Sequence, residues 1–244
     1  MKENKFIIIV PFYNVEKWIK TTIQSIKNQT YQNFEVYFSD DCSSDNSKNL
    51  IKPFIDNNKF FLIENEKRRL ALSNICNAIK IADPNDEDII VNLDGDDWFS
   101  CSNALEIVNS YYQDDTMLTY GNYIHYPDGF IPSNVINYSE DIIKKSDYRK
   151  DIWRASALRT FKYLLWKNIK EEDLKDQTGN YYEMAWDLAY MFPMLEMADD
   201  RWKCVKEIIY CYNLLNPIND HKKDRDKQIF LDLQIRNKKK YVRL

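Results

Sequence analysis

The chain has 244 residues, of which 44% are hydrophobic, 30% charged and 14% aromatic, so it is long enough to bury a core and too rich in aromatic residues for a disordered chain. Its net charge of −4 argues against nucleic acid as the main partner, because nucleic-acid-binding domains carry a basic surface and only Lys238–Lys240 form a local basic cluster.

Five cysteines are scattered along the chain without a Cys-x-x-Cys pair, which predicts neither a disulfide framework nor a zinc site. A reducing cytosol is therefore the expected compartment. The apolar run Phe6–Val10 is too short for a signal sequence or a membrane span. We expect a protein that is cytoplasmic, either soluble or peripheral to the cytoplasmic membrane face.

Strands and helices alternate through the first half of the chain. Short apolar runs predict strands, and apolar residues at helical spacing predict helices between them. The predicted strands are 6–10, 34–38, 60–63 and 89–93, and the predicted helices are 15–28, 46–56 and 70–82. This order predicts an α/β fold with a parallel sheet that has helices on both faces and binds ligands at the carboxyl ends of its strands.

The second half shows a less regular pattern. It predicts helices over 102–112, 155–166 and 181–198, strands over 117–120 and 206–212, and a hairpin turn at 127–129. A loop follows, then a basic helix from about Arg225. We expect one domain over residues 1–220, with halves 1–114 and 115–220, and a C-terminal loop and basic tail helix over 221–244.

Three carboxylates follow the fourth predicted strand, in the sequence Asp94-Gly95-Asp96-Asp97. Like charges about 4 Å apart repel by roughly 4 kcal/mol at an effective dielectric constant near 20, so a cation is expected there. Carboxylate oxygens suit Mg²⁺ or Mn²⁺. A calcium loop does not fit, because Trp98 and Leu105 stand where that loop needs oxygen ligands. An exposed turn with an acidic helix start is the alternative.

Four separated motifs together resemble family 2 glycosyltransferases of the GT-A fold. They are Val10-Pro11-Phe12-Tyr13-Asn14, Asp40-Asp41-Cys42-Ser43-Ser44-Asp45, Asp94-Gly95-Asp96-Asp97, and Asp187 in the second half. The chain departs from the family pattern at Cys42, where glycine is usual.

The resemblance implies a Rossmann-like, mostly parallel central sheet flanked by helices, with a smaller mixed sheet on the acceptor side. Residues 1–114 would then bind a nucleotide-sugar and residues 115–220 the acceptor and catalytic base. The implied activity is metal-dependent, inverting transfer from a nucleotide diphosphate donor, a UDP-sugar, to a hydroxyl of a glycan or other acceptor. The alternatives are a non-catalytic nucleotide- or carbohydrate-binding module of the same fold, and a sugar-nucleotide nucleotidyltransferase, although the glycine-rich loop of the latter is missing.

By the same resemblance, Asp94 and Asp96 form an Asp-x-Asp motif for Mn²⁺ or Mg²⁺. Asp96 is the better direct ligand, while Asp94 is shared between the metal and the nucleotide. Gly95 belongs to the same nucleotide-sugar motif, and Asp97 either orients the sugar or only begins a helix. His221 is a candidate metal ligand from the C-terminal loop, with a solvated loop histidine as the alternative.

The resemblance also implies that Asp41 reads the uracil base, with Asp40 beside it, because a carboxylate accepts the ring N3–H. Helix capping is the alternative for Asp41 and is favoured for Asp45. The remaining nucleotide-binding candidates are Pro11, Tyr13 and Asn14, which would line the base pocket, and Arg69, with Arg68 beside it in a run that can equally be solvated.

Asp187 is the implied catalytic base, with Glu183 as runner-up. The two residues are four apart in the predicted helix 181–198, beside an apolar stripe, and desolvation of a carboxylate favours its use as a base. A structural salt bridge is the alternative.

Four residues around the predicted helix 155–166 are candidates for acceptor contact: Trp153, Arg154, Arg159 and Lys162. The basic tail from Lys238 to Arg243 can dock an anionic membrane or form a solvated helix end. The sequence indicates nothing about oligomeric state.

Overall fold

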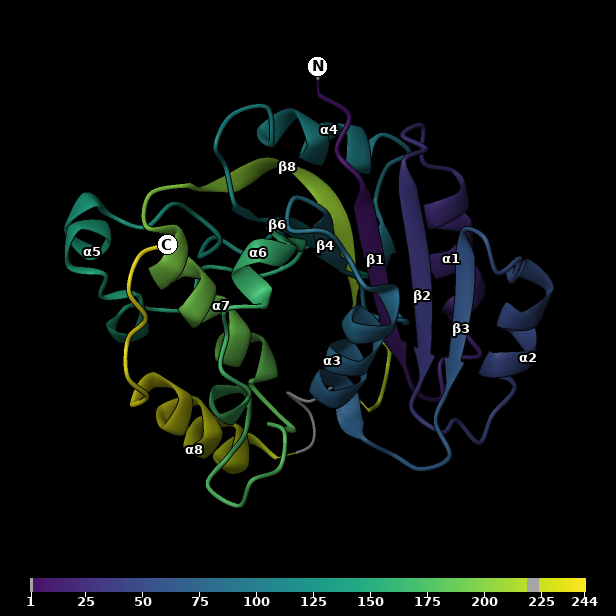
Figure 1. Ribbon diagram of the computed structural model, residues 1–244. Helices are drawn as coiled ribbons and strands as arrows, with labels where there is room; N and C mark the ends of the chain where they lie inside the picture. The colour runs from purple at the N-terminus through teal and green to yellow at the C-terminus, as the bar shows by residue number, and fades with distance from the viewer. Residues whose placement is uncertain (1, 219–223) are drawn as a thin grey trace.

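The computed structural model describes residues 2–218 and 224–244 (Figure 1). Four parallel strands form the first half of the sheet, in the order β3-β2-β1-β4. They are β1 (Phe6–Phe12), β2 (Phe34–Asp40), β3 (Phe60–Glu64) and β4 (Ile89–Asn92). All seven residues of β1 are buried, as expected for a central parallel strand. The predicted alternation of strands and helices is therefore confirmed.

Alternate residues of β1 face two separate cores. Ile7 and Ile9 pack with α3 (Leu70–Ala82) on one face of the sheet. Ile8 and Val10 pack on the other face with α1 (Ile19–Lys27) and α4 (Ala104–Tyr111). The short helix α2 (Ser47–Ile51) lies beside α1 (Figure 1). This alternation follows from the two-residue period of a strand and explains why β1 carries an uninterrupted apolar sequence.

The strands of the second half continue the same sheet. They are β5 (Trp98–Phe99), β6 (Leu118–Tyr126), β7 (Arg159–Lys162) and β8 (Trp202–Asn213), and the full order is β3-β2-β1-β4-β7-β6-β8-β5. Antiparallel β7 joins the two halves, because it pairs with β4 on one side and with β6 on the other. The mixed strands expected on the acceptor side thus extend the central sheet and do not form a sheet of their own.

Two helix predictions in the second half are wrong at their N-terminal ends. The segment 155–166 contains β7 and only a short helix, α6 (Tyr163–Trp166), because pairing with β4 and β6 outweighs the helical spacing of its apolar residues. Helix α7 (Trp186–Ala198) begins five residues later than predicted, after Ala185 adopts a left-handed φ of 51°. From Leu188 onward α7 is buried against the sheet.

The strand predicted over 117–120 extends to Tyr126 in β6. A turn follows as expected, in which Gly129 donates its N–H to His125 O at 3.0 Å. The next element along the chain is the helix α5 (Glu140–Lys145), so the turn does not close a hairpin between two strands. Within the part of the chain that the structure describes, three short 3₁₀ helices complete the fold, at Lys52–Phe54, Tyr148–Lys150 and Glu171–Leu174.

The C-terminal helix α8 (Arg225–Arg236) is present as predicted and packs against α7 through Leu231 and Ile235. Beneath it, buried Arg149 makes a bidentate ion pair with Glu196 of α7, at 2.6 and 2.9 Å, and donates to Ile235 O. Residues 225–244 are therefore part of the packed domain.

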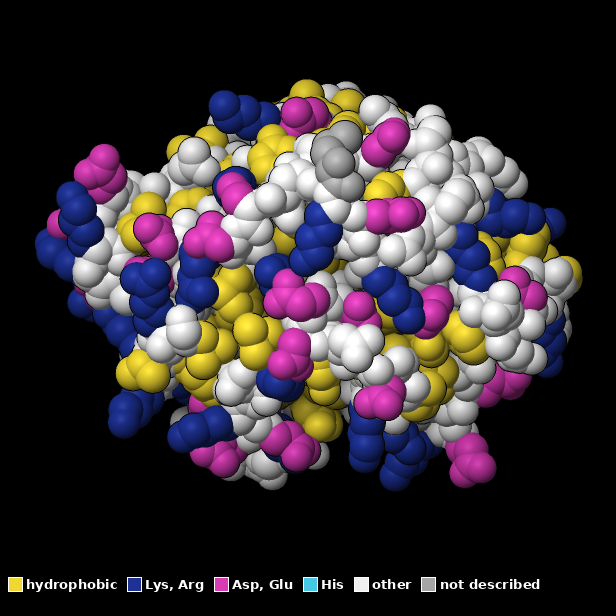
Figure 2. Space-filling model, turned by 45° about the horizontal axis from the view of Figure 1, so that its top comes forward, with side chains coloured by type: hydrophobic (Ala, Val, Ile, Leu, Met, Phe, Trp, Pro, Cys, Tyr) yellow, Lys and Arg dark blue, Asp and Glu magenta, His cyan; other side chains and the backbone are white. Residues whose placement is uncertain are grey.

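The basic tail uses its charges within the molecule. Lys238 pairs with Asp173, Lys240 with Asp147 and Arg243 with Asp199. Three of the four basic side chains predicted to face a membrane thus pair with neighbouring carboxylates. Acidic and basic side chains are interspersed over the face shown in Figure 2. Among the helices of the described residues, none is long and apolar enough to cross a bilayer.

Candidate functional site

A cleft of about 500 Å³ lies at the carboxyl ends of β1, β2 and β4. The second half closes it with the N-terminal end of α7 and with residues that follow β8. Of the predicted site residues, Pro11, Tyr13, Asp41, Asp94, Asp96, Asp97, Glu183 and Asp187 line it. Arg68, Arg159, Tyr212 and Asn216 join them.

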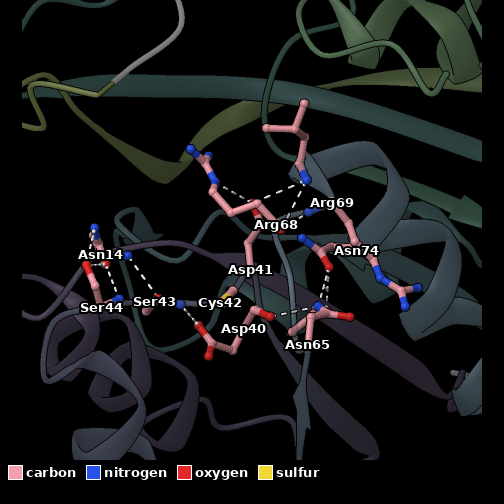
Figure 3. Close-up of polar contacts among 12 residues, drawn as sticks. Asn14, Asp40, Asp41, Cys42, Ser43, Ser44, Asn65, Arg68, Arg69 and Asn74 are labelled. Atoms are coloured by element: carbon pink, nitrogen blue, oxygen red, sulfur yellow. Dashed lines mark hydrogen bonds and ion pairs between the residues drawn. The ribbon is translucent and has the colours of Figure 1, made fainter.

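Asp41 lies at one end of the cleft and caps the N-terminus of α3. Its Oδ1 accepts the backbone N–H of Arg69 at 2.6 Å and of Leu70 at 3.1 Å (Figure 3). The capping alternative is therefore realised, although for α3 and not for the helix that follows β2. Asp45 caps the helix that follows β2, as predicted: its Oδ1 accepts the backbone N–H of Ser47 at 3.0 Å, at the start of α2.

Arg68, and not Arg69, contributes its side chain to the cleft. The guanidinium of Arg68 lies 3.8 Å from the centre of the Tyr13 ring, and its Nε lies 3.3 Å from Asp41 Oδ2. Figure 3 shows the Arg68 and Arg69 side chains pointing in opposite directions. Arg69 was predicted to contact the nucleotide, and this prediction is corrected: the turn into α3 directs its side chain away from Asp41, and its backbone N–H is the group that Asp41 binds.

Asn14 and Asp40 fasten the loop after β2 and do not line the cleft. Asn14 Oδ1 accepts Ser44 N–H at 2.8 Å, and Asp40 Oδ1 accepts Ser43 N–H at 3.0 Å (Figure 3). Both predicted nucleotide contacts are therefore corrected to loop contacts. Cys42 adopts a left-handed φ of 62°, which explains why the position usually carries glycine.

The three acidic residues after β4 have different surroundings. Asp97 is buried and accepts hydrogen bonds from Tyr210 Oη and from Asn213 N–H at 2.7 Å, so it anchors β8. Burial and the nearby Asp96 raise the pKa of Asp97 well above its usual value. The prediction that Asp97 orients the sugar is corrected, because its carboxylate oxygens are turned to the β8 segment.

Asp94 and Asp96 remain as the two carboxylates at the centre of the cleft. Burial, and then repulsion from Asp96, raise the pKa of Asp94 to about 7. Asp96 Oδ2 accepts from Asn216 Nδ2 at 2.7 Å, a contact that brings the segment after β8 to the motif. Sequence reasoning missed Asn216, which lies in the loop predicted over 213–223 and carries no motif of its own.

Gly95 is required by the close approach of two strand ends. A Cβ atom at this position would lie 2.4 Å from Phe12 Cβ, and Gly95 donates its N–H to Pro11 O at 3.1 Å. Gly95 does not line the cleft, so its predicted nucleotide contact is corrected to a packing role. By fixing the turn against β1, it sets the positions of Asp94 and Asp96.

The described residues, 2–218 and 224–244, contain no cluster of three or more metal-ligating side chains. His221, the third predicted ligand, lies outside the described residues. The paired carboxylates of Asp94 and Asp96 nevertheless suit a hard divalent cation. Burial and then repulsion from Asp96 disfavour the charged form of Asp94 and raise its pKa, and a bound cation would offset both effects.

Asp187 lies in the first turn of α7, where Arg159 of β7 donates from Nη2 to its Oδ2 at 2.6 Å. Their side chains are only 17% and 10% exposed, so this ion pair is well shielded from water. Glu183 precedes the helix and pairs with Lys227 at 2.5 Å, so its predicted place on the same helix face as Asp187 is wrong.

The other acceptor candidates separate in the structure. Lys162 pairs with Glu87 at 2.9 Å and Arg154 pairs with Asp151 at 2.6 Å, both away from the cleft. Trp153 and Arg159 instead line a second cavity of about 370 Å³, which shares Asp94, Arg159, Asp187 and Tyr212 with the cleft. We call it the aromatic chamber; its remaining lining residues are Tyr123, His125, Ser156, Ala157, Tyr210 and Leu214.

The family model described as "Glycosyl transferase family 2" matches residues 7–169. The Escherichia coli protein "UDP-Glc:alpha-D-GlcNAc-diphosphoundecaprenol beta-1,3-glucosyltransferase WfgD" is 36% identical over 118 residues, which cover 48% of this chain and 44% of that protein. "Glycosyltransferase GlyA" of Streptococcus pneumoniae serotype 4 is 22% identical over 218 residues, covering 87% of this chain and 31% of that protein. The chain spans less than half the length of these curated relatives.

Solved structures show the same fold at low sequence identity. S. aureus TarS 1-349 in complex with UDP-GlcNAc has a TM-score of 0.68 and 18% identity, over 90% of this chain and 61% of that one. The mannosyltransferase PcManGT from Pyrobaculum calidifontis, in complex with GDP-Man and Mn²⁺, has a TM-score of 0.63 and 17% identity, over 98% and 66% of the two chains. Such glycosyltransferases have the GT-A fold, which is the fold of this chain.

Proposed function

The chain belongs to glycosyl transferase family 2, and we propose that it is a metal-dependent inverting glycosyltransferase that moves a sugar from a UDP-sugar to a hydroxyl of a glycan acceptor. The observation that carries this proposal is the arrangement of one cleft, in which Asp41 lies at one end, Asp94 and Asp96 at the centre, and Asp187 on the opposite wall. A nucleoside diphosphate-sugar needs such a sequence of base, diphosphate and sugar contacts.

The end of the cleft at Asp41 suits a uracil ring. The Arg68 guanidinium lies over the Tyr13 ring and beside the Asp41 carboxylate. Although Asp41 accepts backbone N–H groups of α3, a carboxylate has about four acceptor positions and can also accept the N3–H of uracil. The UDP-GlcNAc complex of TarS, a protein of similar fold, is consistent with this donor class.

The centre of the cleft suits a diphosphate with a divalent cation. Asp94 and Asp96 would hold Mn²⁺ or Mg²⁺, and His221 stays a proposed third ligand. When bound, the cation would offset the negative charge that develops on the departing diphosphate. Arg159 adds a buried positive charge next to both Asp94 and Asp187.

On the opposite wall, Asp187 would take the proton from the acceptor hydroxyl while the hydroxyl oxygen attacks the anomeric carbon. Attack from the side opposite the diphosphate inverts the configuration at that carbon. Arg159 holds Asp187 through Oδ2, fixing the direction of the carboxylate. WfgD, by its name, acts on a GlcNAc-diphosphoundecaprenol, which supports a sugar hydroxyl as the acceptor here.

Release of UDP from a panel of UDP-sugars, with Mn²⁺ or with EDTA, tests the proposal. We expect turnover with Mn²⁺ that EDTA and Asp96→Ala both abolish. Asp187→Asn should lower transfer by roughly 10²- to 10⁴-fold without weakening UDP binding, because it removes the base and keeps the shape of the side chain. Glu183→Gln is the matched control and should transfer normally.

Two outcomes would count against the proposed roles. If Glu183→Gln loses transfer and Asp187→Asn does not, Glu183 is the base. If wild-type protein binds UDP in calorimetry but turns over no nucleotide-sugar, the chain is a binding module of the same fold.

A further inference from the structure

We propose that the aromatic chamber is the acceptor subsite and that it recognises a pyranose ring. This inference rests on the proposed function and adds to it where the acceptor binds and which chemical class it has. The chamber adjoins the donor cleft but leads away from the nucleotide end, where Asp41 and Tyr13 lie.

The sheet register brings the aromatic rings of the chamber together. In the parallel pair of β6 and β8, Tyr123 stands opposite Tyr210, and His125 stands opposite Tyr212. Residues two apart on a strand share a face, so all four side chains lie on one face of the sheet. Ring centres of Tyr123, His125 and Tyr212 lie 5.5 to 5.8 Å from one another.

The segment that precedes β7 supplies three further lining residues, Trp153, Ser156 and Ala157. Trp153 is partly buried, packs edge-on against Phe192 of α7 at 5.4 Å between ring centres, and is thereby held in place. A cavity lined by aromatic rings from two separate segments of the chain suits a ligand with apolar C–H faces.

The base of the chamber is polar and charged. Asp94, Arg159 and Asp187 lie there, at the boundary with the donor cleft. A carboxylate accepts hydrogen bonds from hydroxyl groups, and a guanidinium donates hydrogen bonds to hydroxyl oxygens. A pyranose combines apolar C–H faces with hydroxyls around its edge, and a hydroxyl placed at this boundary reaches Asp187 from the side away from the nucleotide.

A groove beside α8 is the competing route to Asp187. It has about 290 Å³ and is lined by polar residues of α8, including Arg225, Gln228 and Asp232; among the described residues that line it, Trp153 is the one with an aromatic ring. Asp94 lines the chamber but is not among the residues that line this groove. The chamber is therefore the better place for a ring that must meet the donor sugar.

Ligand-observed NMR with a panel of methyl pyranosides, in the presence of UDP and Mn²⁺, tests the assignment. We expect at least one pyranoside to bind wild-type protein, and His125→Ala and Trp153→Ala to weaken it about tenfold each, equivalent to about 1.4 kcal/mol. Ile124→Ala is the matched control, because Ile124 lies on β6 between Tyr123 and His125 and faces the other side; it should bind as wild type.

Donor hydrolysis without acceptor, measured in the same variants, separates this proposal from the proposed function. His125→Ala and Trp153→Ala should hydrolyse the UDP-sugar at the wild-type rate and show a raised acceptor KM. The subsite assignment is overturned if no pyranoside binds wild-type protein or if His125→Ala binds it unchanged; a loss in Trp153→Ala alone would assign the acceptor to the groove beside α8, which Trp153 also lines. The assignment is also overturned if the two variants lose donor hydrolysis together with pyranoside binding. Absence of UDP binding and of donor hydrolysis in wild-type protein would instead refute the proposed function itself.

Discussion

Asp41 makes two contributions that a single substitution can separate: it caps α3, and we propose that it accepts the N3–H of uracil. In Asp41→Asn, the remaining carbonyl oxygen can still accept the N–H groups of Arg69 and Leu70, and asparagine caps helices about as well as aspartate. The lost ion pair with Arg68, whose side chain is 46% exposed, is worth at most about 1 kcal/mol. The free energy of unfolding should therefore change by less than about 1 kcal/mol.

The effect on nucleotide binding should be larger. The amide NH₂ of asparagine is a donor and would face the N3–H donor of uracil, so a charge-assisted hydrogen bond of about 1.5–3 kcal/mol is lost. That loss corresponds to roughly a 10- to 150-fold weaker Kd for UDP. Cytosine has an acceptor at N3, so the preference for UDP over CDP should narrow in the same variant.

Calorimetry with UDP and CDP, together with urea denaturation, measures both effects. Asp45→Asn is the matched control, because Asp45 also caps a helix, α2, but does not line the cleft. It should leave both affinities unchanged. If Asp41→Asn keeps the wild-type UDP affinity and base preference while Asp41→Ala loses stability, Asp41 is only a cap and the reasoning about the base is refuted.

Two further predictions concern the frame around the site. Gly95→Ala should lower the free energy of unfolding by about 1–3 kcal/mol, because the added Cβ would lie 2.4 Å from Phe12 Cβ. Gly121→Ala is the control and should lower it less, because the nearest atom, Val205 Cβ, would lie 3.2 Å away. Equal losses of the two variants in urea denaturation would contradict the close-approach argument. Arg149→Met should lower the free energy of unfolding by about 3–5 kcal/mol, because it leaves the fully buried carboxylate of Glu196 without its cation. Lys144→Met, which removes an exposed ion pair, should lower it by less than about 1 kcal/mol. Similar thermal stabilities of the two variants would show that the buried pair does not hold α7 in place.

Local sequence patterns were sufficient to predict the elements that carry the donor half of the site. The helix over Leu70–Ala82 has the predicted bounds, and β1 and β4 end within two residues of prediction. These elements are determined by short-range periodicity, and the motif residues follow the strand ends directly. For that reason Asp41, Asp94 and Asp96 meet in one cleft as the alternating order predicts.

Tertiary contacts decided what the neighbouring residues do. Asp94, Asp96 and Asp97 stand side by side in the sequence, but the contact of Asp97 with Tyr210 depends on β8, more than a hundred residues away. Arg68 and Arg69 are likewise equivalent in sequence, and the turn into α3 places only the first in the cleft. Such choices depend on packing partners that no local pattern identifies.

The sequence by itself determined the alternating sheet, the family resemblance and the acidic motif, because each depends on local periodicity or on short motifs that can be recognised one at a time. Only the tertiary structure decided that 159–162 forms a strand, which carries Arg159 to Asp187, and that β6 and β8 align Tyr123 and His125 with Tyr210 and Tyr212. A strand is stabilised by partners on both sides, and its register is set by pairing across the sheet. The acceptor side of the site therefore appears only when the sheet is assembled.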